Sequence, residues 1–387
     1  MKKKVAVFTG TRAEYGLLYW IIKGLSESTK ADLQLFAGGM HLSPEFGKTI
    51  NQIKYDGFEV TEQLEFLLSS DSPVGIAKSM GLAMISAADA LQRTRPDMLV
   101  VLGDRYEALA VCQAAMVAQI PIAHIHGGET TEGLIDEAVR HSITKMSHLH
   151  FTATEVYRKR VIQLGEMPET VYNYGAPGID NIKRLKLLER SKLSEAIEFD
   201  VLTTPFMVVT YHPVTLNEDG AIDDFKNLLL TLEKYENFKF IITYPNADTF
   251  GRALIDLLET FKERHPENVL LTKSLGQLRY LSVLKHSELA IGNSSSGLIE
   301  APSFKIPTVN IGERQRGRVT GETVINCDGS SDSIEKAINK ALSSQFKKVC
   351  ERSKNPYGDG DSSQKILDTI LNAELDNLVY KKFYDLS

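Results

Sequence analysis

Residues 97–145 decide the fold, and they read DMLVVLGDRYEALAVCQAAMVAQIPIAHIHGGETTEGLIDEAVRHSITK. Two short apolar runs, residues 98–102 and 120–125, are separated by one helix length with a helical pattern. Continuous apolar runs of this length are typical of strands that are buried on both faces of a parallel sheet. The alternation of strand and helix predicts a doubly wound α/β sheet.

Polar residues follow both predicted strands at the point where each strand ends. Asp104 and Arg105 come after the first strand, and His126 and Glu129 come after the second. In an open parallel sheet, ligands bind outside the carboxyl ends of the strands. We therefore expect both clusters to line one crevice.

The next predicted helix adds a further acid and a further base. Asp136 and Arg140 are four residues apart and share a helical face. Carboxylates, a histidine and arginines from neighbouring elements favour proton transfer beside an anion. The candidate catalytic residues are Asp104, His126, Glu129, Asp136 and Arg140. The alternative is that the charged residues form ordinary surface ion pairs; for His124, inside the strand, a core histidine is the better interpretation.

Composition limits the classes of function. The chain has 387 residues, 43% hydrophobic and 24% charged, which suits two ordinary globular domains. A net charge of −6 argues against nucleic acid or an anionic membrane as a partner. We expect no signal peptide and no apolar run of membrane-spanning length. Three scattered cysteines without a CxxC spacing predict reduced thiols in a cytoplasmic protein.

The beginning of the chain predicts an anion site. A strand over residues 5–8 leads into GTRAEYG, residues 10–16, and then into a helix. Free backbone amides at such a turn, with Arg12 beside them, are suited to an anion. Neither GxGxxG nor GxxxxGK[ST] is present at this turn, so the motif does not support a dinucleotide site or a P-loop. His41 follows the next strand, where a lone loop histidine is more often simply solvated.

A second series of strands and helices begins near residue 206 and predicts a second parallel sheet. We place the first Rossmann-like domain at residues 1–176 and the second at 177–362, because residues 174–178 form a turn-rich break. Residues 363–387 are predicted to form a C-terminal helix that returns to the first domain.

The second domain has its own polar strand ends. His212 follows its first strand, and the run GNSSSG at residues 292–297 opens a predicted helix that carries Glu300. Glycines and hydroxyl residues before a helix suit a diphosphate, and Glu300 suits ribose hydroxyls. The alternative for the serines is a plain helix N-cap. Arg314 lies in a basic stretch, residues 312–318, for which phosphate contact and a solvated loop are equally good interpretations.

The GT-B architecture consists of two Rossmann-like domains that face a central cleft. Here one predicted domain carries acid/base groups and the other carries a predicted diphosphate-binding site. We predict that fold for this chain.

The motifs resemble one family in particular. GTRAEYG, LGDRYEALA, HIHGGE, IDEAVRHSITK, YHPVT and GNSSSGLIEAP with its later RQRGR are similar to those of hydrolysing UDP-N-acetylglucosamine 2-epimerases of sialic acid-type biosynthesis. The resemblance extends through both domains, over residues 3–318.

This resemblance implies a reaction. The enzyme would take the C2 proton, expel UDP from C1 to give a glycal-like intermediate, add water and return a proton to the opposite face of C2. The products would be UDP and the free manno-configured sugar. Such chemistry needs acid/base groups and a cationic cradle for the leaving diphosphate, but no cofactor and no metal.

The resemblance also implies roles for the residues. Asp104 and Asp136 are the leading proton-transfer candidates, and Arg140 orients one of them or the diphosphate. The candidate substrate and UDP contacts are Arg12, His41, Arg105, His124, His212, Asn293, Ser294, Ser295, Ser296, Gly297, Glu300 and Arg314. Non-hydrolysing epimerases carry a glutamate where His126 stands, so HGGE places this chain in the hydrolysing branch and leaves the two faces of the ring unassigned.

Three alternatives remain open. The same reaction could use UDP-2,4-diacetamido-2,4,6-trideoxyglucose, on the route to legionaminic-type sugars. A GT-B glycosyltransferase would share the fold but would need an acceptor cleft. A sugar-nucleotide sensor would bind without turnover, although fold by itself does not distinguish the three. The resemblance further suggests a homodimer or homotetramer.

Overall fold

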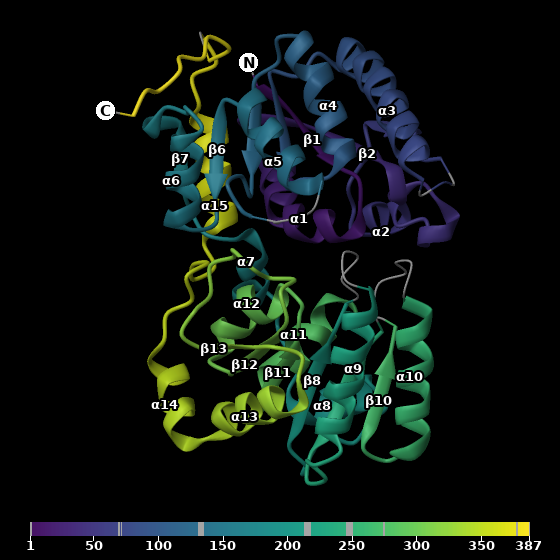
Figure 1. The fold of residues 1–387 in the computed structure, drawn as a ribbon. Helices are drawn as coiled ribbons and strands as arrows, with labels where there is room; N and C mark the ends of the chain where they lie inside the picture. The colour runs from purple at the N-terminus through teal and green to yellow at the C-terminus, as the bar shows by residue number, and fades with distance from the viewer. Residues whose placement is uncertain are drawn as a thin grey trace. The chain divides into compact units, whose positions relative to one another are not determined.

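The computed structural model describes residues 2–68, 70, 72–130, 135–212, 218–244, 251–273, 275–376 and 378–386, without the side chains of 218–221 and 251–253. The chain divides into two compact units. Unit 1 contains residues 1–180 and 357–387, and unit 2 contains residues 181–356. Each unit is built on one parallel sheet with helices on its faces (Figure 1).

The sheet of unit 1 has seven strands in the order β3-β2-β1-β4-β5-β6-β7, and every neighbouring pair is parallel. The order reverses between β1 and β4, which makes their carboxyl ends the topological switch point. The strands are β1 (Lys3–Thr9), β2 (Ala31–Gly38), β3 (Glu62–Leu64), β4 (Met98–Leu102), β5 (Ile122–Ile125), β6 (Leu149–Thr152) and β7 (Val171–Asn173).

Alternate residues of β1 face two helical layers. Val5 and Val7 pack with α1 and α15, whereas Ala6 and Phe8 pack with α3 and α4. The helices of this unit are α1 (Arg12–Glu27), α2 (Ile50–Tyr55), α3 (Pro73–Thr94), α4 (Tyr106–Val117), α5 (Ile135–Met146), α6 (Glu155–Gln163) and α15 (Ser362–Asn372), with the 3-10 turns η1 (Gly39–His41), η2 (Pro44–Phe46) and η3 (Pro168–Thr170). Helix α7 (Pro177–Arg184) crosses the division between the units.

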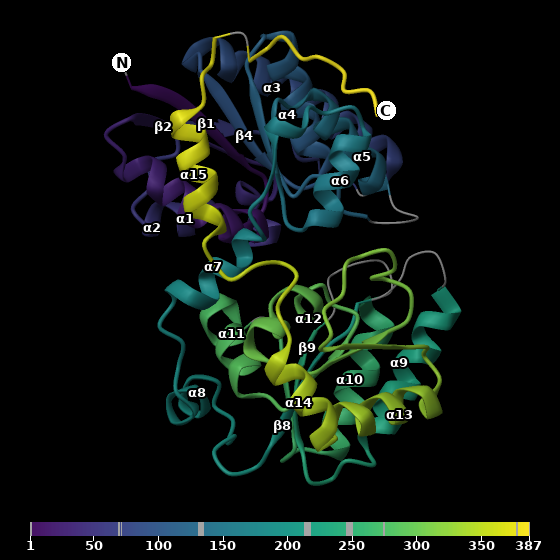
Figure 2. The ribbon, with the colours of Figure 1, turned by 90° about the vertical axis from the view of Figure 1, so that its left-hand side faces the viewer.

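Helix α15 brings the end of the chain back to unit 1. Figure 2 shows α15, in yellow, alongside α1. A Cβ built on Gly24 of α1 would lie 2.3 Å from Leu367 Cδ2, so this glycine permits the close contact between the helices. The helix covers Ser362–Asn372, so it ends well before the end of the predicted C-terminal segment, residues 363–387.

Helix α3 is long and apolar enough to cross a membrane by length and composition alone, contrary to the expectation from the sequence. One such helix is weak evidence, because core helices pass the same test. Ala83, Ala87 and Ala90 are buried in the core that α3 shares with α4.

The sheet of unit 2 has six parallel strands in the order β10-β9-β8-β11-β12-β13, with its switch point between β8 and β11. Its strands are β8 (Phe206–Thr210), β9 (Lys239–Thr243), β10 (Val269–Thr272), β11 (Leu289–Gly292), β12 (Thr308–Ile311) and β13 (Val324–Cys327). Its helices are α8 (Arg190–Ala196), α9 (Glu218–Leu232), α10 (Gly251–Arg264), α11 (Gly276–His286), α12 (Ser296–Ile299), α13 (Ser331–Leu342) and α14 (Ser344–Arg352), with the 3-10 turn η4 (Ala301–Phe304).

The two predicted parallel sheets are confirmed, and several elements differ in detail. Strands β3 and β13 and helices α6, α13 and α14, which lack a long apolar run, were not predicted from the sequence. The helix opened by the run GNSSSG is present but shorter than predicted: α12 has only four residues, Glu300 is its C-terminal cap, and a 3-10 turn follows.

Candidate functional site

The carboxyl ends of β4 and β5 are joined by one buried arginine from α5. Arg140 donates from Nη1 to the His126 carbonyl oxygen at 2.8 Å and from Nη2 to Asp104 Oδ2. Arg140 is only 3% exposed. The predicted convergence of Asp104, His126 and Arg140 is therefore present in the structure, and Arg140 orients the Asp104 carboxylate.

His126 and Glu129 form a second pair in the same loop. His126 Nδ1 donates to Glu129 Oε1, and both residues are buried. Since Nδ1 carries the proton of this bond, a neutral ring presents the lone pair of Nε2, and Nε2 has no partner among the described residues. A histidine that is oriented by a carboxylate in this way is suited to accept a proton.

The loop conformation that makes this pair is unusual. His126 has a φ of +66°, and Gly128 has a φ of +78°. A Cβ on Gly128 would lie 2.5 Å from the carbonyl oxygen of Tyr157, so only glycine fits there. The HGGE sequence thus allows the loop to turn sharply after β5 and to return Glu129 to His126.

Asp136 lies in the first turn of α5, on the same helix as Arg140. Burial raises the pKa of its carboxyl group, and the nearby charge of Asp104 raises it further, while Arg105 and Arg140 oppose the shift. Two carboxyl groups that influence each other beside two guanidinium groups are a typical arrangement for proton transfer.

The two histidines predicted inside or just after strands are core residues. His41 is fully buried, with Nε2 3.0 Å from Thr9 Oγ1 and Nδ1 2.8 Å from Thr49 Oγ1. His124 donates from Nε2 to the Gly103 carbonyl oxygen at 2.8 Å. Burial lowers the pKa of His41 to about 4 and that of His124 to about 3, so both are neutral near pH 7.

Arg12 and Arg105 stand at the switch point itself. Arg12 is exposed at the start of α1, and its side chain makes no hydrogen bond to the other residues that the structure describes. Arg105 donates from Nε to Glu107 Oε1 at 2.6 Å, and its side chain is 31% exposed. Both guanidinium groups are thus placed at the strand ends where an anion is expected.

Two buried glutamates at this place were not among the predicted site residues. Glu14 accepts a hydrogen bond from the Gly10 amide, and Glu107 faces the same glycine. Burial first and then the charge of Glu107 raise the pKa of Glu14 to about 7. Glu14 lies in the motif GTRAEYG and Glu107 in the motif LGDRYEALA. A glutamate in the first turn of a largely apolar helix is the sequence feature that could have identified each of them.

In unit 2, Asn293 connects the ends of β8 and β11. His212 N donates to Asn293 Oδ1, and Asn293 Nδ2 donates to the His212 carbonyl oxygen, both at 2.8 Å. The Asn293 carbonyl oxygen accepts from Arg314 Nη1 at 3.0 Å and from Gln315 Nε2 at 2.8 Å. Burial, then Arg314, lowers the pKa of His212 to about 4. Pro213–Thr215 of the YHPVT motif lie outside the described residues.

The serine run lies just beyond Asn293. Ser294, Ser295 and Ser296 are half-buried, and a small pocket there is lined in part by Ser294, Gly297 and Tyr280. Tyr280 donates its hydroxyl to Ser296 Oγ at 2.8 Å and was not predicted from the sequence. A Cβ on Gly297 would lie 2.7 Å from Thr308 Cγ2, so a larger residue would push α12 from the sheet. Glu300 is half-buried at the end of α12.

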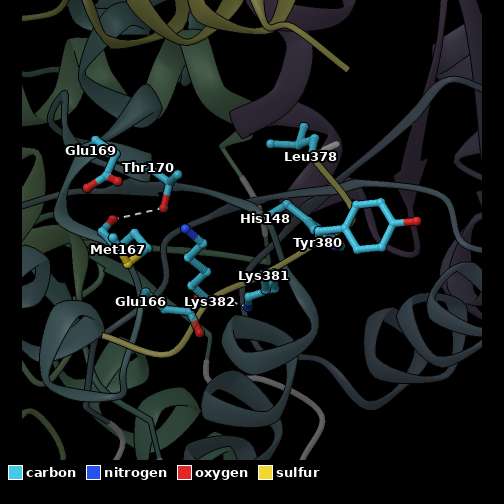
Figure 3. A pocket seen from close by; sticks show the side chains of 9 residues that line it. All are labelled: His148, Glu166, Met167, Glu169, Thr170, Leu378, Tyr380, Lys381 and Lys382. Atoms are coloured by element: carbon cyan, nitrogen blue, oxygen red, sulfur yellow. Dashed lines mark hydrogen bonds and ion pairs between the residues drawn. The ribbon is translucent and has the colours of Figure 1, made fainter. Parts of the chain in front are cut away.

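The opposite end of the unit 1 sheet also holds buried charges. Glu166 accepts from Lys145 at 2.7 Å and from His150 at 2.9 Å, and it pairs with Lys381 at 2.7 Å. A cavity of about 270 Å³ adjoins this cluster. Figure 3 shows its lining residues, which are His148, Glu166, Met167, Glu169, Thr170, Leu378, Tyr380, Lys381 and Lys382.

Metal ligands do not cluster in the part of the chain that the structure describes: no three His, Cys, Asp or Glu side chains are placed to hold an ion. The three cysteines are unpaired, and Cys112 and Cys350 are buried.

Known proteins are similar to this chain in sequence and in fold. A family model described as UDP-N-acetylglucosamine 2-epimerase matches residues 23–371. GDP/UDP-N,N'-diacetylbacillosamine 2-epimerase (hydrolyzing) of Campylobacter jejuni is 39% identical over 386 residues, which cover 100% of both chains. Polysialic acid biosynthesis protein P7 of Escherichia coli is 38% identical, with 99% of this chain and 98% of that protein covered. UDP-N,N'-diacetylbacillosamine 2-epimerase (hydrolyzing) of Legionella pneumophila is 35% identical, with 99% of each covered.

A solved structure agrees with the fold. The UDP-GlcNAc 2-epimerase of Neisseria meningitidis, bound to UDP-GlcNAc, has a TM-score of 0.83 at 22% identity and covers 96% of this chain and 100% of that one. The fold is GT-B-like, with two parallel-sheet α/β units. On the family match and the full-length relatives together, the chain belongs to the UDP-N-acetylglucosamine 2-epimerase family.

Proposed function

We propose that the chain is a hydrolysing 2-epimerase that converts a UDP-linked 2-acetamido sugar and water to UDP and the free manno-configured sugar. One observation carries the proposal: Arg140 joins the Asp104 carboxylate to the His126 loop, in which His126 pairs with Glu129. This network unites two potential proton carriers at strand ends where an α/β sheet binds its ligand.

The reaction proceeds in two halves. First, a basic group removes the proton from C2, the C1–C2 double bond forms, and the C1–O bond to UDP breaks. Then water adds to C1 as a hydroxyl group and gives its other proton to a basic group, while an acidic group returns a proton to the other face of C2. Asp104, Asp136 and the His126–Glu129 pair are the groups we assign to these transfers. His41 and His124 position their neighbours, since their ring nitrogens are bonded within the core.

We assign different roles to the residues of the two units. Unit 1 carries the proton-transfer groups together with Arg12 and Arg105, which neutralise the leaving diphosphate. Unit 2 carries the nucleotide-binding residues, which are His212, the serine run and Arg314, with Glu300 on the ribose. The neutral imidazole of His212 is suited to donate or accept one hydrogen bond beside a phosphate.

The substrate we propose is UDP-N,N'-diacetylbacillosamine, the 2,4-diacetamido-2,4,6-trideoxy sugar. Two relatives at 39% and 35% identity bear that sugar in their names. UDP-N-acetylglucosamine, the first expectation from the sequence, is the second candidate, because a relative at 38% identity is named for polysialic acid biosynthesis. The two sugars differ at C4 and C6, so a few pocket side chains would decide between them.

A proton NMR time course in heavy water tests the proposal. Each sugar nucleotide is incubated with the enzyme, without an acceptor, and UDP release and the C2 signal are followed. We expect UDP and a manno-configured sugar with deuterium at C2, formed faster from the diacetamido sugar. An intact nucleotide with no exchange at C2 for either sugar would contradict the epimerase assignment and favour a glycosyltransferase or a sensor.

A further inference from the structure

Two carboxyl groups converge on Gly10 at the switch point of unit 1. Glu14 Oε2 accepts from the Gly10 amide at 2.9 Å. A Cβ built on Gly10 would lie 3.0 Å from Glu107 Oε1 and 3.3 Å from Glu14 Oε2. Glu14 is 6% exposed and Glu107 is 1% exposed, so both carboxyl groups are withdrawn from water.

Arg105 is anchored on this pair. Its Nε donates to Glu107 Oε1 at 2.6 Å, and no other side-chain hydrogen bond of Arg105 occurs among the described residues. Glu107 Oε2 is buried and has no partner in the described part of the chain. The anchor therefore fixes one edge of the guanidinium and leaves its terminal nitrogens available to an anion.

The charges around Glu14 come from few groups. Glu107 in α4 and Arg105 before α4 act on it electrostatically, and the Gly10 amide and Thr11 hydrogen-bond to it. With Glu14 protonated, Arg105 and an ionised Glu107 sum to zero. With Glu14 ionised, the three groups sum to −1, which opposes an incoming anion.

Burial, followed by the Glu107 charge, raises the pKa of Glu14 to about 7, so this change of charge falls near neutral pH. A carboxyl group buried beside a second one behaves in this way because both cannot ionise readily together.

We propose that Glu14 and Glu107 are positioning residues: Glu107 orients Arg105 towards the diphosphate of the substrate, and the proton on Glu14 sets how strongly that site holds the anion. This inference rests on the proposed function for the identity of the anion, but it concerns binding rather than turnover. Affinity for the nucleotide falls as the pH rises through the range in which Glu14 loses its proton.

UDP itself is the probe, measured by calorimetry between pH 5 and pH 9. The wild type is compared with Glu14→Gln, and the ratio of their dissociation constants is taken at each pH, so that the ionisation of UDP cancels. We expect a ratio near one at low pH and weaker wild-type binding, by roughly fivefold, at high pH, the order of one partly screened charge.

Two further variants complete the test. In Glu107→Gln the transition moves to lower pH, because the neighbouring negative charge is gone. Glu62→Gln removes a comparable Arg–Glu pair, with Arg93, at the edge strand β3, and keeps the wild-type profile. Melting curves of all four proteins identify any variant that is not folded, and Glu14→Gln alone still decides the question.

The outcomes separate the two proposals. Equal pH profiles for wild type and Glu14→Gln, or a wild type that does not bind UDP, would overturn the inference. UDP binding with the expected profile, but no UDP release from any sugar nucleotide, would refute the epimerase activity and leave the role of the carboxyl pair intact.

Discussion

Two buried glutamates of unit 1 lie at opposite ends of the sheet, and their pKa values are shifted in opposite directions. Glu166, before β7, is surrounded by Lys145, His150 and Lys381. Burial would raise its pKa, but these donors lower it to about 2. Glu14, after β1, has another carboxyl group beside it, and its pKa rises to about 7.

The difference shows that burial alone does not determine whether a carboxyl group is protonated. At the amino ends of the strands, three donors surround one carboxylate, so the cluster is structural. At the carboxyl ends, Glu14 and Glu107 lie near one cation, Arg105, and the Glu107 charge raises the pKa of Glu14 further. Buried atoms without partners among the described residues occur at both ends, at Glu107 Oε2 and His126 Nε2 and at His150 Nδ1, so the balance of charge distinguishes the two clusters.

The largest effect should come from the carboxyl end of the sheet. Asp136→Asn removes a carboxyl group to which we assign proton transfer but keeps the shape of the side chain. We expect kcat to fall by about 10²–10⁴-fold, with little change in stability. Rates of UDP release and melting curves check this, and a variant with full activity would remove Asp136 from the reaction.

At the amino end, Glu166→Gln should destabilise the fold by about 2–3 kcal/mol, because the buried carboxylate that accepts from His150 and pairs with the partly exposed Lys145 and Lys381 loses its charge. The lowered pKa of Glu166 means that its ionised form stabilises the folded state. This contribution is fully present above about pH 4.5, the ordinary pKa of a glutamate, and is lost as the pH falls towards 2. The variant should therefore lose less stability than the wild type over that range.

Urea unfolding at several pH values measures this effect. Glu155→Gln, which removes an exposed pair with Arg158, serves as the control and should change little. Unchanged stability of Glu166→Gln would show that the cluster is not structural.

Glu14→Gln should act in the opposite sense. The raised pKa of Glu14 means that the folded state holds its proton more tightly than the unfolded state, so wild-type stability falls as the pH rises from about 4.5 to about 7. The glutamine variant escapes this loss and should be more stable than the wild type by about 2–3 kcal/mol at pH 8, but not at pH 4.

The control for this variant is Glu27→Gln at the exposed end of the same helix, which should show no such dependence on pH. A Glu14→Gln protein that is less stable than the wild type at pH 8 would mean that Glu14 is ionised and well solvated in the fold.

The smallest effect should follow Lys381→Met. Lys381 pairs with Glu166 and also donates to the carbonyl oxygens of Lys145 at 2.8 Å and Ser147 at 2.5 Å. Since Lys145 and His150 still satisfy Glu166, we expect a loss of only about 1 kcal/mol in urea unfolding. A loss as large as that of Glu166→Gln would make the C-terminal segment the principal support of the cluster.

Much of the fold follows from local patterns. The predicted bounds of β4, residues 98–102, agree with the structure, because a strand that is buried along its whole length must be apolar along its whole length. Strands β3 and β13 were missed, since short, partly exposed strands lack that pattern.

The site was only partly predictable. Asp104 and His126 were expected to lie close together because strand ends in a parallel sheet share one edge, whereas the contacts of Arg140 with Asp104 and with the His126 carbonyl oxygen are seen only in the structure. His41 and His124 have the same residue type, yet the structure buries them with bonded ring nitrogens. Which polar residues face a ligand depends on neighbours that are distant in the sequence.

The sequence by itself determined the two parallel sheets, the strand ends where polar groups gather and the family of the chain, because periodicity and local motifs are properties of adjacent residues. Only the tertiary structure decided which charges meet. The pairing of Glu14 with Glu107 joins residues from α1 and α4, and that of Glu166 with Lys381 joins residues more than 200 positions apart. The pKa of a buried group depends on such contacts, which arise only when the elements pack.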